Sequence, residues 1–184
     1  MPASHRVSPQ ERRCYEESIN LKQKPEISDT PGLAMSYGGL GRLELFVEPT
    51  NVAKAGEYLE LDLEYSEQTG DIAGQTIMHS LIGYCQLLED NVTEAQKRYE
   101  RSLELASNPI ARFHALHGLV RALARNPRNE ELQGRALELG ELMEKESLPE
   151  NLRDILADTL RLEGARMPAQ VRDVLETAFK EQGD

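Results

Sequence analysis

The sequence predicts an all-α protein, an antiparallel helix-pair solenoid of about nine helices. Three observations support this prediction. Apolar residues recur with the roughly 3.6-residue period of an amphipathic helix along most of the chain, while the alternating pattern of a strand is nearly absent. Capping residues, prolines and glycines mark many helix ends. Similar helix pairs recur at a period of about 40 residues, which is typical of repeat proteins.

The first predicted helix runs from about Ser8 to Lys24. Its start is marked by Ser8 as an N-cap, by Pro9 at the first helical position and by Glu11 as the partner in a capping box. A proline suits this position because the backbone N–H that it lacks would have no partner there.

The same chemistry predicts the later helix ends. Prolines open helices at Thr30-Pro31 and Asn108-Pro109, and Gly70 ends a helix in the left-handed conformation before Asp71 caps the next. After the first helix, the predicted helices span about residues 31–46, 51–69, 71–89, 91–106 and 109–125, then one from a break at 127–129 to 145, one from the capping box Ser147-Leu148-Pro149-Glu150, and one over 168–181.

Small residues mark the repeat. Glycines in the first helices of successive pairs fall 42 and then 35 positions apart, and alanines in the second helices fall 40 and then 41 apart. These residues are Gly41, Gly83 and Gly118 in the first helices and Ala55, Ala95 and Ala136 in the second helices. A glycine inside a helix costs about 1 kcal/mol relative to alanine, which is explained if two helices cross closely at that point.

These positions resemble the small and large signature positions of the tetratricopeptide repeat family, in its long-period type found in kinesin light chains and bacterial regulators. The resemblance rests on Leu40-Gly41 with Ala55, on Ile82-Gly83 with Ala95 and Tyr99, and on the turn Thr69-Gly70-Asp71. It implies a superhelical repeat array over residues 1–146, beginning with the second helix of a pair, and a C-terminal helical cap over 147–184.

Composition disfavours several classes of function. The net charge is -11, which argues against nucleic acid as a partner because binding to phosphates needs clustered lysine and arginine. No apolar run is long enough to cross a membrane, and the N-terminus lacks the apolar core of a signal peptide, so we expect a cytoplasmic protein. Cys14 and Cys85 have no partner at ligand spacing and are expected to be buried, reduced thiols.

No catalytic constellation is found, so we expect no enzyme, no cofactor and no metal. His114 and His117 have metal-ligand spacing, but no third ligand follows at helical distance, and packing or surface roles are favoured. The stretch 107–128 holds four arginines and no acidic residue. Two explanations stay open: Arg121 and its C-terminal neighbours stabilise a helix end, or the stretch meets an acidic partner or the acidic helices of a neighbouring copy, such as residues 57–67.

In tetratricopeptide-like solenoids the first helix of each pair lines the concave face. The resemblance therefore implies a partner-binding surface formed by Met35, Arg42, Leu45, Ile77, Ser80, Tyr84, Leu87, Arg112, Ala115 and Leu119. This lining is mostly apolar and favours an amphipathic helix or an extended apolar peptide, with Tyr84 as an anchor. The competing explanation is that each of these residues packs against the next helix.

The expected function is that of a scaffold or adaptor that binds a protein segment. The alternative is a regulatory or self-assembly domain of a larger signalling protein, which forms a homo-oligomer through its unpaired first helix around Tyr15.

Overall fold

The computed structural model describes residues 9–125, 130–146 and 148–180, and this part of the chain contains nine α-helices, one short 3-10 helix and no strand. The helices are α1 (Pro9–Lys22), α2 (Thr30–Phe46), α3 (Val52–Thr69), α4 (Ile72–Leu88), α5 (Val92–Leu105), α6 (Pro109–Ala124), α7 (Glu131–Lys145), α8 (Glu150–Glu163), the 3-10 helix Gly164–Arg166, and α9 (Ala169–Lys180). The prediction of an all-α fold in which consecutive helices pack as a repeat is confirmed. None of the helices described is long and apolar enough to cross a bilayer.

Some predicted features lie outside the described residues. They are the caps Ser8 and Ser147, the predicted break at Pro127, the last arginine of the stretch 107–128, which is Arg128, and the predicted helix end at Glu181.

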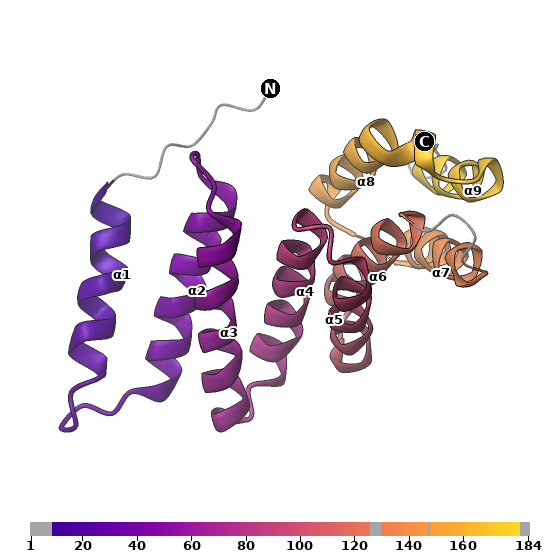
Figure 1. Cartoon of the computed structure of the whole chain (residues 1–184). Coiled ribbons are helices and arrows are strands. Elements are labelled where there is room, and N and C mark those ends of the chain that lie inside the picture. The colour runs from indigo at the N-terminus through magenta and orange to yellow at the C-terminus, as the bar shows by residue number, and fades with distance from the viewer. Residues whose placement is uncertain (1–8, 126–129, 147, 181–184) are drawn as a thin grey trace. The chain divides into compact units, whose positions relative to one another are not determined.

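The chain divides into two compact units, unit 1 (Met1–Asp90) and unit 2 (Asn91–Asp184). In unit 1, α1 to α4 run alternately in opposite directions and each packs on the next (Figure 1). In unit 2, α5, α6 and α7 pack in sequence, α9 packs on α7, and α8 contacts both α6 and α9. Helices α8 and α9 of the predicted cap pack on α6 and α7 within unit 2.

The first helices of the pairs, α2, α4 and α6, begin with the same cap. Asp29, Asp71 and Asn108 each accept a hydrogen bond on Oδ1 from the backbone N–H three residues later, at 3.0, 2.9 and 2.9 Å. The caps satisfy N–H groups that have no partner within the helix. They also give the three helices a common origin, so residues at the same distance from the cap occupy equivalent positions.

Two tyrosines lie on glycines at equivalent positions. A Cβ added to Gly39 would lie 2.3 Å from Cε1 of Tyr15, and one added to Gly118 would lie 2.0 Å from Cε1 of Tyr99. Both glycines are the tenth residue after their N-cap. Since α1 packs on α2 as α5 packs on α6, α1 corresponds to α5, the second helix of a pair.

Replacing Gly118 by alanine is expected to destabilise the protein more than replacing Gly39. Tyr99 is 3% exposed, so its ring has no room to move, whereas Tyr15 is half-buried and can turn toward solvent. Crowding of about 1–3 kcal/mol or more should outweigh the helix propensity that alanine gains at Gly118. We expect a net loss of about 2 kcal/mol for Gly118→Ala and almost none for Gly39→Ala, measured by urea unfolding.

Gly134 provides the control for this comparison, because an added Cβ there meets nothing within 4 Å. Gly134→Ala should raise the free energy of unfolding by about 1 kcal/mol through helix propensity alone. Equal effects of alanine at Gly118 and Gly134 would contradict the close packing of Tyr99.

Candidate functional site

Six of the ten residues predicted to contact a partner reach the surface of the structure. They are Met35 and Arg42 on α2, Ile77, Ser80 and Tyr84 on α4, and Arg112 on α6. Met35 is 74% exposed and Ile77 46% exposed, which is unusual for apolar side chains of their size.

The other four predicted residues belong to the core, and the prediction is corrected for them. Leu45, Leu87, Ala115 and Leu119 are each at most 3% exposed. For Leu45 on α2 and Leu87 on α4 the prediction is one residue early. Each residue turns the helix by about 100°, and the exposed neighbours are Phe46 and Leu88.

On α6 the predicted row is two residues early. The spacing of the glycines pairs Gly118 with Gly41, but the structure pairs it with Gly39, because Gly41 is contacted by Leu59 and not by a tyrosine. Counted from the caps, Arg121 is equivalent to Arg42 and to Tyr84, each of them thirteen residues after its cap. Arg112 instead forms an ion pair with Glu138 of α7, with 2.6 Å between Nη2 and Oε1.

An exposed apolar surface, called here the α2–α4 face, remains in unit 1. It consists of Met35, Arg42 and Phe46 from α2 and Ile77, Tyr84 and Leu88 from α4. Phe46 and Tyr84 stack across the two helices with ring centroids 6.1 Å apart and an interplanar angle of 14°. Since Phe46 is still 59% exposed, the stacked pair presents an aromatic surface to solvent.

The α2–α4 face carries little charge. Helix α4 contains no charged residue, and α2 contains only Arg42 and Glu44, of which Glu44 is buried and paired with Arg12 and Lys54. The neighbouring α3 contains six charged residues, five of them acidic. The apolar surface therefore bears a single exposed charge, the guanidinium of Arg42.

A buried carboxylate lies beside Arg42. Asp62 of α3 is 6% exposed, and its Oδ2 would lie 2.0 Å from a Cβ added to Gly38, so the missing side chain of Gly38 makes room for it. Oδ1 accepts a hydrogen bond from Oγ of Ser66 at 3.0 Å. Burial raises the pKa of Asp62, and the Ser66 hydrogen bond and the positive charge of Arg42 oppose this effect.

In unit 2 the equivalent positions of α6 are occupied by α8. His117 and Thr159 share a hydrogen bond of 2.7 Å between Nε2 and Oγ1, and Phe113 stacks on the His117 ring. Arg121 donates from Nε and Nη2 to Oε1 of Glu163, at 3.1 and 2.8 Å. Sequence reasoning missed these contacts, although counting from the helix caps instead of the glycines would have placed His117 and Arg121 on this face.

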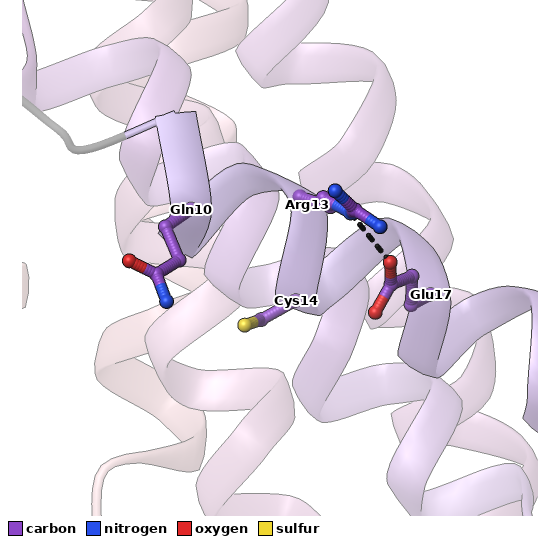
Figure 2. A pocket seen from close by; sticks show the side chains of 4 residues that line it. All are labelled: Gln10, Arg13, Cys14 and Glu17. Atoms are coloured by element: carbon purple, nitrogen blue, oxygen red, sulfur yellow. Dashed lines mark hydrogen bonds and ion pairs between the residues drawn. The ribbon is translucent and has the colours of Figure 1, made fainter.

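The outer side of α1 carries a shallow pocket. Figure 2 shows its lining, Gln10, Arg13, Cys14 and Glu17, all from one helix, with an ion pair of 2.6 Å between Arg13 and Glu17. Cys14 is exposed, so the prediction that it is buried is wrong, whereas Cys85 is buried and its pKa is raised to about 11 by burial. Because residues of one helix cannot enclose a ligand, this pocket does not define a binding site.

Self-association through α1 stays a prediction. Tyr15, which the sequence placed at such an interface, packs on Gly39 within unit 1.

Within the described residues no three histidine, cysteine or acidic side chains gather as a metal site. No protein-family model, curated protein or solved structure matches this chain.

Proposed function

We propose that this chain is a tetratricopeptide-like scaffold or adaptor that binds an apolar segment of another protein on the α2–α4 face. The observation that carries the proposal is the exposed row of Met35, Phe46 and Ile77, extended by the stacked Tyr84. Contiguous exposed apolar surface is typical of interaction sites, and aromatic residues dominate the binding energy at such sites. The proposal also assigns the chain to the cytoplasm and gives it no catalytic role.

The α2–α4 face is suited to this role because its helices pack against a hydrophobic core on their other side. Leu45, Leu59, Met78 and Ile82 form one core between α2, α3 and α4, so the exposed side chains stand on a packed support. A rigid surface loses less conformational entropy when it binds than a mobile one does.

A double substitution, Phe46→Ala with Ile77→Ala, tests the proposal. Peptides of about 16 residues would be selected on the wild-type protein from a displayed library, and their affinities compared between proteins by fluorescence anisotropy. We expect binding to weaken at least about tenfold, since hot-spot side chains contribute about 2 kcal/mol each. Both side chains are largely exposed, so the fold measured by circular dichroism should not change.

Leu162→Ala is the matched control, because Leu162 is an exposed apolar residue of α8 in unit 2. It should leave peptide affinity unchanged. Selected peptides that bind the double variant as tightly as the wild type would contradict the proposed site.

A further inference from the structure

Helices α2 and α6 share a local cap and, more specifically, the same contact with a tyrosine. Each begins with a side chain, Asp29 or Asn108, that accepts a hydrogen bond from the backbone N–H three residues later, as Asn51 also does in α3. Each receives a tyrosine of the preceding helix on its tenth residue after the cap, Gly39 or Gly118. Positions on α2 can therefore be compared with positions on α6 at the same distance from the cap.

On α6 this equivalence identifies two positions that hold α8. His117 and Arg121, the ninth and thirteenth residues after the cap, contact Thr159 and Glu163. Thr159 and Glu163 are four residues apart, so they lie on one side of α8. The same side carries Leu152 and Leu156, which are buried.

Helix α8 is thus an amphipathic segment seated on α6. The buried residues of α8 are apolar in its first two turns, at Leu152 and Leu156, and polar in its last two, at Thr159 and Glu163. Its opposite side is exposed and charged, with Asp154, Asp158 and Arg161.

On α2 one of the two equivalent positions is open, and the other is filled from within unit 1. Arg42 corresponds to Arg121, but it is exposed and has no ion-pair partner among the described residues. A Cβ added to Gly38, which corresponds to His117, would meet Oδ2 of Asp62 and lie 3.5 Å from Nη1 of Arg42, so this position is already filled.

We infer that the α2–α4 face binds an amphipathic helix of a partner protein in the way that α8 lies on α6. This inference rests on the proposed function and names the partner's chemistry. The helix carries Asp or Glu opposite Arg42, as α8 carries Glu163 opposite Arg121. Apolar residues on the same side of the helix cover Met35 and the Phe46–Tyr84 pair.

The selected peptides test the inference at the Arg42 position. Peptides selected on wild type should carry Asp or Glu, and selection on Arg42→Glu should replace the acid by Lys or Arg. Arg42→Gln should weaken an acid-bearing peptide about tenfold, and so should changing that acid to its amide. Combining the two changes should cause no further loss, because both remove the same contact.

Two further measurements complete the test. Arg13→Gln on α1, an exposed arginine in the same unit, should leave affinity unchanged and controls for net charge. A proline in the middle of a bound peptide should reduce affinity more than a hundredfold, because it breaks a helix but is tolerated in an extended chain.

The outcomes separate this inference from the proposed function. Peptides that require Phe46 and Ile77 but tolerate proline, or show no preference for an acid, overturn the helical partner and leave the binding face in place. Peptides that bind independently of Phe46 and Ile77 overturn both.

Discussion

Arg121→Met is expected to lower the free energy of unfolding of unit 2 by about 3–5 kcal/mol. The Glu163 side chain is 10% exposed, and its Oε1 accepts both hydrogen bonds from Arg121. Its Oε2 is buried without a hydrogen-bond partner. Removing the arginine leaves a buried charge without compensation, which costs more than the ion pair itself contributes.

The double variant Arg121→Met with Glu163→Met separates the ion pair from general packing. It removes both charges, so it should recover most of the stability that the single variant loses. Urea unfolding followed by hydrogen exchange of the α6 and α8 amides measures the effect in unit 2. A double variant as unstable as Arg121→Met would show that the unpaired carboxylate is not the cause.

Acidification is expected to weaken unit 2 through His117. Burial lowers the pKa of His117 to about 3, with the charge of Arg121 adding to the effect, whereas the unfolded chain binds this proton near 6.5. The neutral histidine therefore contributes stability that is fully present above about pH 6.5 and is lost as the pH falls toward 3. Between pH 7 and pH 4 the loss through this residue should be about 3 kcal/mol.

His117→Gln is the matched variant, because glutamine does not titrate and still offers a hydrogen-bonding group to Thr159. It should be less stable than wild type at pH 7, where it lacks the ring stacked on Phe113, but it should lose less stability between pH 7 and pH 4. Urea midpoints at several pH values give both quantities. Parallel pH curves for the two proteins would contradict the assignment to His117.

The sequence predicted only some of the exposed residues of the candidate site. Met35 and Ile77 lie close to the caps Asp29 and Asp71, so helix periodicity could place them among the exposed residues. Leu45 and Leu87 were misplaced because an error of one residue, accumulated over four turns, exchanges an exposed position for a buried one.

The equivalence of the repeats depended on contacts that the sequence does not display. Two glycines of α2 contact different neighbours, because Tyr15 packs on Gly39 and Leu59 packs on Gly41. Spacing alone could not tell which of them Gly118 matches. Because Gly118 was aligned with Gly41, the predicted row on α6 was shifted by two residues and did not include Arg121.

The sequence by itself determined the helical class and the positions of the turns. Caps and glycine turns act over three or four residues, so the chemistry at Asp71 or at Gly70, whose φ is 69°, can be predicted locally. Only the tertiary structure decided which side of each first helix is covered. The pair Arg121–Glu163 joins residues 42 positions apart, and leaves Arg42 as its open counterpart. Such contacts depend on which helices meet in space, and that is set by packing of the whole core.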